Sequence, residues 1–219
     1  MYWMSLVIIF APLLGSLVLL FSRDLSETYS AIIANLSIAI SALTSLGLLI
    51  PFLFNNGISE EFFLYTWYLT GDYHFQLGFL VDSLTAVMAF IVCFISFFVH
   101  MYSITYMHND NSFKRFFIYT NFFTFSMLII IFSNNFLQLF IGWELVGLSS
   151  YLLIGFWHKK ESAIQANLKA FIVNRVGDMG LLLGVLIVFI STKSLSYDVL
   201  FNNLTELDNQ VISFFLFSN

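Results

Sequence analysis

The sequence predicts an all-α, polytopic bundle of membrane-spanning helices, and three observations lead to this prediction. The chain of 219 residues is 59% hydrophobic and 10% charged, with a mean hydropathy of +0.89. An ordinary soluble domain is roughly 25% charged, so this chain has too few charged side chains to cover a soluble surface. Its apolar runs are continuous over about twenty residues or more, the length that a helix needs to cross a bilayer. Barrel strands would instead alternate apolar and polar residues.

The composition also excludes several classes of function. A net charge of −5 offers no basic surface for a nucleic acid. Cys93 is the one cysteine, which excludes a disulfide framework and any cysteine-rich metal or iron–sulfur site. The sequence contains no glycine-rich phosphate loop, no arrangement of nucleophile and base, and no haem or flavin site. We therefore expect no redox chemistry and no cofactor in this chain.

The apolar runs predict six full membrane spans, at residues 4–22, 30–54, 82–106, 113–132, 134–157 and 163–192. The links between most of them are short and polar, and Asn134–Asn135 makes the turn before the fifth span very tight. Asp82 opens the third span and is expected to cap its helix. No repeat or low-complexity linker divides the chain, so we interpret residues 1–219 as a single membrane domain.

The stretch 55–81 does not read as a span. It carries Glu60 and Glu61, and it alternates in part around Gly71–Asp72. Aromatic and β-branched residues around a Gly-Asp turn favour a short β-hairpin at the outer membrane interface. The alternative is an irregular outer loop with aromatic anchors.

The last stretch, residues 193–219, begins as a polar connection. The segment Val211–Phe217 is apolar again, but seven residues cannot cross a hydrocarbon core of about 30 Å. We interpret this stretch as the start of a seventh helix, which either a partner completes or which stays at the interface.

The distribution of basic residues predicts the orientation of the spans. The links after the first, third and fifth spans hold five Lys or Arg residues, whereas the opposite side holds only Lys193. These five are Arg23, Lys114, Arg115, Lys159 and Lys160. The basic links should therefore face the inner compartment, with the N-terminus and the stretch 55–81 outside.

Ionisable residues inside the spans are the candidates for function, because each costs about 2.5–3.5 kcal/mol at mid-membrane on insertion scales. Glu144 lies in the fifth span with no cation one turn away, so its partner must come from elsewhere. Arg175 and Asp178 lie three residues apart in the sixth span and can pair on one helix face. A buried carboxylate can gain and lose protons near neutral pH. We expect a proton relay, with structural ion pairing as the alternative.

Two further residues inside the spans carry less specific signals. Lys169, near the inner end of the sixth span and on the side opposite Asp178, either joins the relay or places its amine at the interface. His100 in the third span is interpreted as a hydrogen-bonded packing histidine rather than a proton carrier.

Five runs of residues resemble a known family. They are FLQLFIGWE at 136–144, SYLLIGFW at 150–157, KAFIVNRVGD at 169–178, GFLVDSLT at 78–85 and HMYSITYM at 100–107. These runs resemble the N-terminal part of chain 5 of NADH–ubiquinone oxidoreductase, over about residues 65–192. Sister antiporter-like subunits share some of these elements, but the run Asn-Arg-Val-Gly-Asp favours chain 5.

The resemblance implies an antiporter-like membrane-arm subunit of respiratory complex I, part of an enzyme that pumps protons as it reduces ubiquinone. In that family the glutamate of the fifth helix pairs with a lysine of a broken seventh helix. Glu144 matches the glutamate, while Arg175 and Asp178 match the charged pair beside it. The resemblance also implies partners, namely the other complex I subunits, which would carry NADH, FMN, iron–sulfur clusters and ubiquinone, and membrane lipids.

Two features depart from the family pattern. Leu145 stands where chain 5 proteins usually have glycine, which alters the packing beside Glu144. Members of the family are more than twice as long, so the later lysines and the lateral helix are missing from this first half of the antiporter-like fold. We therefore expect a split subunit, in which a second polypeptide supplies the remaining helices.

Two other functions remain open. One is a subunit of a multi-subunit sodium/proton antiporter, and the other is a structural subunit of the membrane arm that conducts no protons. For the location we expect the mitochondrial inner membrane, with the N-terminus facing the intermembrane space, because 28 Phe and only 2 Pro suggest an organelle genome rich in A and T.

Overall fold

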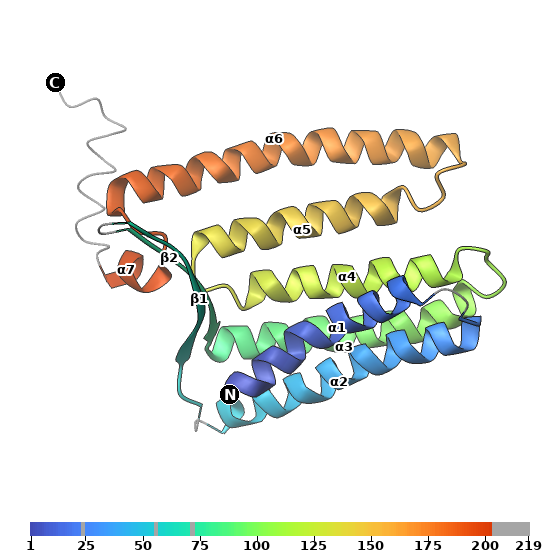
Figure 1. Cartoon of the computed structure of the whole chain (residues 1–219), viewed down its shortest axis with the longest axis horizontal. Helices are drawn as coiled ribbons and strands as arrows, with labels where there is room; N and C mark the ends of the chain where they lie inside the picture. The colour runs from blue at the N-terminus through green and yellow to red at the C-terminus, as the bar shows by residue number, and fades with distance from the viewer. Residues whose placement is uncertain (23–24, 55–56, 71–72, 203–219) are drawn as a thin grey trace.

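The computed structural model describes residues 1–22, 25–54, 57–70 and 73–202 as six long helices, one β-hairpin and one short helix (Figure 1). The helices are α1 (Tyr2–Phe21), α2 (Glu27–Leu53), α3 (Ser83–Tyr106), α4 (Phe113–Ile131), α5 (Phe136–Ile154), α6 (Glu161–Thr192) and α7 (Tyr197–Asn202). The strands are β1 (Glu60–Thr70) and β2 (Tyr73–Val81). The helices α1 to α6 are each long and apolar enough to cross a membrane, so the predicted all-α membrane bundle is confirmed.

Some residues with a predicted role lie outside the described part of the chain. They are Arg23 and Asp24 of the first link, Asp72 of the hairpin turn, and the apolar segment Val211–Phe217. The start of a seventh helix therefore stays a prediction.

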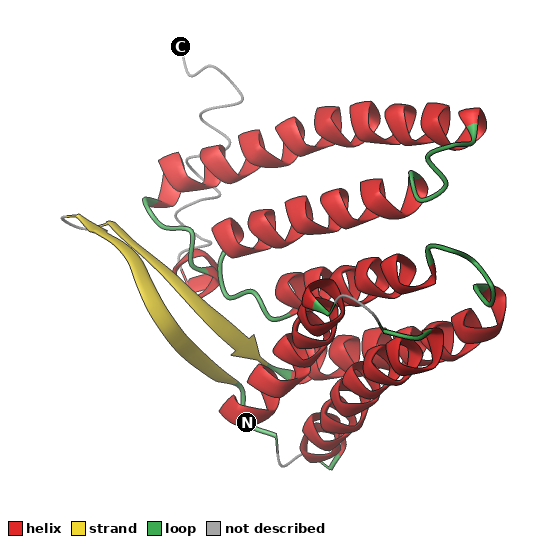
Figure 2. Ribbon diagram, turned by 45° about the vertical axis from the view of Figure 1, so that its right-hand side comes forward, coloured by secondary structure: helices red, strands yellow, loops and turns green. Residues whose placement is uncertain are grey.

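The helices form two packed groups that share α4. Helices α1, α2, α3 and α4 pack on one another, whereas α4, α5 and α6 lie side by side in one layer (Figure 1, Figure 2). Among the described helices, α6 packs mainly against α5. With 32 residues, α6 is about 48 Å long, so it exceeds the hydrocarbon thickness and extends beyond it or tilts.

Small polar residues join α1, α2 and α4. The Ser37 hydroxyl of α2 donates to Asn121 Oδ1 of α4 at 3.1 Å, and the Ser41 hydroxyl donates to the carbonyl of Ile8 in α1 at 3.0 Å. At Gly15 the helices α1 and α2 approach so closely that a Cβ atom would lie 2.3 Å from Ser37 Oγ. Small residues and interhelical hydrogen bonds of this kind hold helices together in lipid, where apolar burial contributes little.

Helix α3 shows the two local features that its sequence predicts. The Asp82 carboxylate accepts a hydrogen bond from the backbone N–H of Thr85 at 2.7 Å, so the predicted cap is confirmed. His100 is buried, and its Nδ1 donates to the carbonyl of Ser96 at 2.8 Å. This is the hydrogen-bonded packing role that we expected.

The stretch between α2 and α3 contains the predicted hairpin rather than an irregular loop, and its strands of 11 and 9 residues are longer than expected. Its antiparallel register runs from Glu60 opposite Val81 to Thr70 opposite Tyr73, with shifts between Phe63 and Tyr65 and between Thr66 and Tyr68. The hairpin crosses one end of the helices (Figure 2). Its length lets it contact the link between α4 and α5.

The turn Asn134–Asn135 is the joint between this hairpin and the helices. The Asn134 amide donates to Glu61 Oε1 at 2.7 Å, and the Asn135 amide donates to the carbonyl of Gln76 at 2.8 Å. The Asn135 side-chain oxygen also accepts from the N–H of Gln138 at 2.8 Å and so caps α5. The predicted tight turn therefore has a second role that local sequence did not indicate.

The polar connection after α6 contains a short helix, α7, that the sequence did not predict. Lys193 ends α6 in a left-handed conformation (φ 57°), and the chain then returns to the start of α5. The N–H of Phe136 donates to the carbonyl of Leu195 at 3.0 Å, and the ring of Tyr197 lies 4.9 Å from that of Phe136. Burial raises the pKa of the Tyr197 hydroxyl, whereas its hydrogen bond with Ser133 opposes this rise. Contacts between segments far apart in the chain leave no periodic pattern in the sequence, so the sequence did not predict α7.

Substitution of two glycines of α5, Gly142 and Gly147, tests whether the close packing of α5 on α4 contributes to stability. A Cβ atom at Gly142 would lie 2.7 Å from Ile130 Cγ1 and 3.0 Å from the Ile130 backbone nitrogen, whereas nothing lies within 4 Å at Gly147. We expect Gly142→Ala to destabilise the protein by about 1–3 kcal/mol through overpacking, and Gly147→Ala to be neutral or slightly stabilising. The temperature at which the buried Cys93 thiol becomes reactive to a maleimide measures this difference. Equal temperatures for the two variants would refute the expectation.

Candidate functional site

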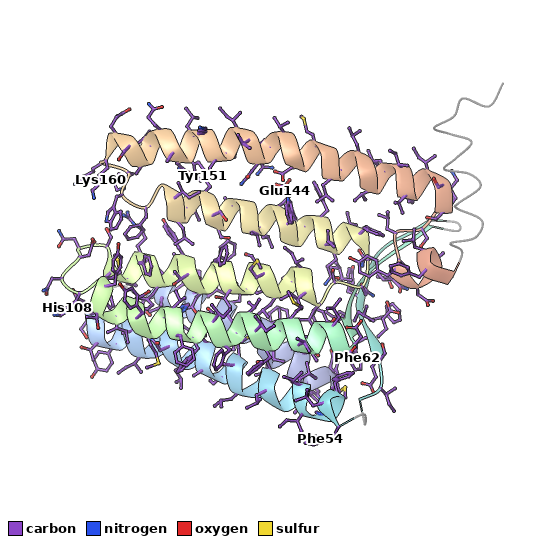
Figure 3. All side chains as sticks on the ribbon, turned by 180° about the vertical axis from the view of Figure 1, so that it is seen from behind. Phe54, Phe62, His108, Glu144, Tyr151 and Lys160 are labelled. Atoms are coloured by element: carbon purple, nitrogen blue, oxygen red, sulfur yellow. The ribbon has the colours of Figure 1, made fainter. Side chains whose placement is uncertain are left out.

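Glu144 lies midway along α5, between α5 and α6 (Figure 3). The close packing of Gly142 on Ile130 sets the distance between α4 and α5, and with it the position of Glu144. The Glu144 side chain is 26% exposed. Because no cation lies one turn away on α5, the partner of Glu144 had to come from another helix. The facing helix α6 supplies it.

Arg175 of α6 is that cation. Its Nη1 donates to Glu144 Oε2 in an ion pair, and the same atom lies 3.6 Å from Asp178 Oδ2 on its own helix. The guanidinium also lies over the Phe171 ring, with Cζ 5.2 Å from the ring centroid. One guanidinium is therefore shared by two carboxylates from different helices, and the three groups together carry a formal charge of −1.

Asp178 is held from a second direction by a residue that sequence analysis missed. The indole Nε1 of Trp143 donates to Asp178 Oδ1 at 2.9 Å. A tryptophan inside a membrane-spanning helix needs an acceptor for its N–H group, and this requirement is the signal that could have identified Trp143. Asp178 and Val185 are the buried residues of α6, and Asp178 is 8% exposed.

The structure separates Lys169 from this cluster. Lys169 lies on an exposed face of α6 and makes no hydrogen bond or ion pair with any residue that the structure describes. Its role in a relay stays a prediction. The structure thus brings Glu144, Arg175 and Asp178 together and adds Trp143.

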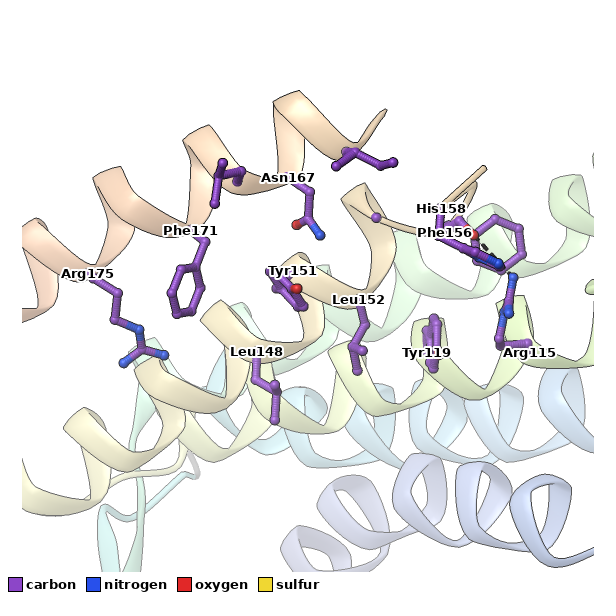
Figure 4. Close-up of a pocket in the computed structure, with 13 residues that line it drawn as sticks. Arg115, Tyr119, Leu148, Tyr151, Leu152, Phe156, His158, Asn167, Phe171 and Arg175 are labelled. Atoms are coloured by element: carbon purple, nitrogen blue, oxygen red, sulfur yellow. Dashed lines mark hydrogen bonds between the residues drawn. The ribbon is translucent and has the colours of Figure 1, made fainter. Parts of the chain in front are cut away.

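Two cavities flank the cluster. One of about 790 Å³ extends from Arg115 and His158, at the basic ends of the helices, to Phe171 and Arg175 (Figure 4). Another of about 510 Å³ is lined by Trp143 and Asp178, together with Leu139, Val146, Ser150, Asn174 and neighbouring residues. Arg175 borders the first cavity and Asp178 the second, so the two cavities reach the cluster from different residues.

The cluster contains acid–base groups and a hydrogen-bond donor but no metal site. Within the described ranges, no three His, Cys, Asp or Glu side chains come together in a way that could hold a metal ion. The arrangement places one guanidinium within reach of two carboxylates from different helices. The expectation that the redox cofactors bind in other subunits stays a prediction.

Comparison with known proteins identifies the family. Residues 67–117 match a family model described as NADH–ubiquinone oxidoreductase (complex I), chain 5 N-terminus, and residues 133–218 match one described as NADH:quinone oxidoreductase/Mrp antiporter, transmembrane. The chain is 46% identical over 213 residues to NADH-quinone oxidoreductase subunit L of Neisseria meningitidis, covering 96% of this chain and 32% of that protein. It is 43% identical over 215 residues to NADH-ubiquinone oxidoreductase chain 5 of Chondrus crispus, again covering 96% of this chain and 32% of the relative.

A solved structure shares the fold. A chain of the membrane-bound sulfane sulfur reductase, an archaeal respiratory membrane complex, superposes with a TM-score of 0.71 over 88% of this chain and 38% of that chain, at 15% identity. This chain spans about a third of the length of the relatives that it matches in sequence. The chain belongs to the chain 5 and subunit L family of NADH–quinone oxidoreductase membrane subunits, and it corresponds to the N-terminal part of such a subunit.

Proposed function

We propose that this chain contributes part of a proton-translocation path to a respiratory NADH–quinone oxidoreductase. The observation that carries the proposal is the sharing of Arg175 by Glu144 and Asp178 within the membrane-spanning helices. Charged groups at this depth are costly unless they are paired. Two carboxylates and one guanidinium leave one negative charge, which a proton can neutralise.

The cluster couples the position of a proton to the position of Arg175. When Glu144 is ionised, it competes with Asp178 for the guanidinium. When Glu144 takes up a proton, its attraction for the guanidinium weakens, and Arg175 can move fully to Asp178. The position of Arg175 therefore depends on whether Glu144 is protonated, and this position changes the charge that Asp178 experiences. A relay with two alternating states requires such a dependence.

The two cavities suggest how protons approach the cluster. Water in the larger cavity would connect the basic ends of the helices with Arg175, and water in the smaller one would reach Asp178. Arg175 and Asp178 would then be the residues at which the two water-filled regions meet the relay. Lys169 stays a candidate member of this relay, at the inner end of α6.

The remaining helices of the path would come from residues outside this sequence. We propose that the partners are the other subunits of the complex and membrane lipids. The lysine that the family pairs with the fifth-helix glutamate would then approach Glu144, which is 26% exposed here.

A second candidate function is a subunit of a sodium/proton antiporter, because the family model for residues 133–218 also covers Mrp antiporters. Separation of gently solubilised native complexes tests the choice. We expect the chain to migrate with NADH dehydrogenase activity. Migration in a large complex without NADH oxidation would instead support the antiporter.

Substitution of Glu144 tests the relay. We expect Glu144→Gln to lower the number of protons translocated per NADH oxidised several-fold in membrane vesicles, because the amide cannot exchange a proton or balance Arg175. The variant chain should still migrate with NADH dehydrogenase activity on a native gel, which shows that the complex is assembled. Glu161→Gln is the matched control, since Glu161 is an exposed carboxylate at the start of α6. Normal pumping by Glu144→Gln would refute the relay and leave a structural role for this chain.

We propose the mitochondrial inner membrane as the location, with the N-terminus facing the intermembrane space. His108 and Lys160 lie at one end of the bundle, and Phe54 and Phe62 lie at the other (Figure 3). The end with His108 also carries Lys114, Arg115 and Lys159, and a basic end faces the inner compartment.

Cysteine labelling tests this orientation. In a Cys93→Ala background, a membrane-impermeant maleimide should label Lys159→Cys only in inside-out vesicles, because a basic end faces the matrix. It should label Phe63→Cys, in an exposed position of β1, only in mitoplasts with an intact inner membrane. The reverse pattern would show the opposite orientation.

A further inference from the structure

Trp143 donates a hydrogen bond to one oxygen of the Asp178 carboxylate, while the other oxygen faces Arg175. The indole N–H donates to Asp178 Oδ1 at 2.9 Å, while Asp178 Oδ2 lies 3.6 Å from Arg175 Nη1. Each carboxylate oxygen therefore has a different partner, one from α5 and one from α6. Because Asp178 is 8% exposed, a missing donor there would leave a buried oxygen without compensation.

Trp143 and Glu144 are successive residues of α5, and they reach the same ion pair from two sides. Successive side chains of a helix point about 100° apart. Glu144 accepts from Arg175, and Trp143 donates to Asp178. Trp143 lines the smaller cavity together with Asp178, whereas Arg175 borders the larger one. Two adjacent residues of α5, Trp143 and Glu144, thus bind the two charged residues of α6, Asp178 and Arg175.

We propose that Trp143 is a positioning residue of this cluster: its indole N–H fixes the Asp178 carboxylate and so determines how Arg175 is shared between Asp178 and Glu144. The inference rests on the proposed relay function and adds a residue to it. Without the indole donor, the Asp178 carboxylate can turn both oxygens toward Arg175. The guanidinium is then drawn from Glu144, and the two alternating states are no longer balanced.

The first test measures proton pumping by the whole complex in membrane vesicles. Trp143→Phe keeps an aromatic ring but removes the N–H donor, and it should lower pumping per NADH oxidised by roughly tenfold, the factor that corresponds to a hydrogen bond to a charged group. Trp157→Phe is the matched control, because it removes an indole N–H that donates to Asp110 at 3.4 Å in an exposed link. This control should pump normally.

A double-mutant cycle separates positioning from a general packing effect. If Trp143 acts through Asp178, the variant Trp143→Phe with Asp178→Asn should pump no worse than Asp178→Asn alone. If Trp143 only supports packing between α5 and α6, the two losses should multiply, and this outcome overturns the inference.

A spectroscopic measurement tests the bond itself. The ultraviolet resonance Raman band of the indole N–H, isolated as the difference between the wild type and Trp143→Phe, should shift to that of an unbonded indole in Asp178→Leu. An unchanged band would show that Trp143 does not donate to Asp178 and would overturn the inference. Normal pumping by Asp178→Asn would instead refute the proposed function, so the two failures are distinguishable.

Discussion

The need to neutralise Arg175 within the membrane-spanning helices is the constraint on which the site depends. In lipid, apolar faces provide little drive for one helix to pack on another. Helix α6 illustrates this, since Asp178 and Val185 are its buried residues and most of its surface is exposed. The ion pair with Glu144 and the hydrogen bond from Trp143 are therefore polar contacts that hold α6 on α5. The contact that holds the helices and the contact that would carry the proton are the same.

The sequence predicted the spans and three of the four residues in this cluster because both signals are local. Membrane spans follow from the length of apolar runs, and Glu144, Arg175 and Asp178 are costly wherever they lie in a span. Which cation meets Glu144 depends on the register of α5 against α6. No pattern within either helix encodes that register, so the sequence showed that a partner was required but not that Arg175 supplies it.

The parts that sequence analysis missed are also long-range. The turn Asn134–Asn135 was visible as a short link, but its contacts with Glu61 and Gln76 join segments about sixty residues apart or more. The short helix α7 docks on the start of α5 through Tyr197 and Phe136 in the same way. A hairpin signal around Gly71–Asp72 was detectable, whereas the length of the strands depends on this anchoring.

The two groups of helices differ in how their polar atoms are held, and this difference bears on function. In α1 to α4, the hydroxyls of Ser37 and Ser41 make hydrogen bonds inside a packed interior, and these groups carry no charge. In α5 and α6, Arg175 has two carboxylate partners within reach, and cavities lie on either side. A group with alternative partners can change state without unfolding the helices around it. Because Arg175 joins α6 to Glu144 of α5, a proton that moves Arg175 in the proposed relay would also change this contact between the two helices. The proposed relay would therefore couple proton occupancy and helix packing through one interaction.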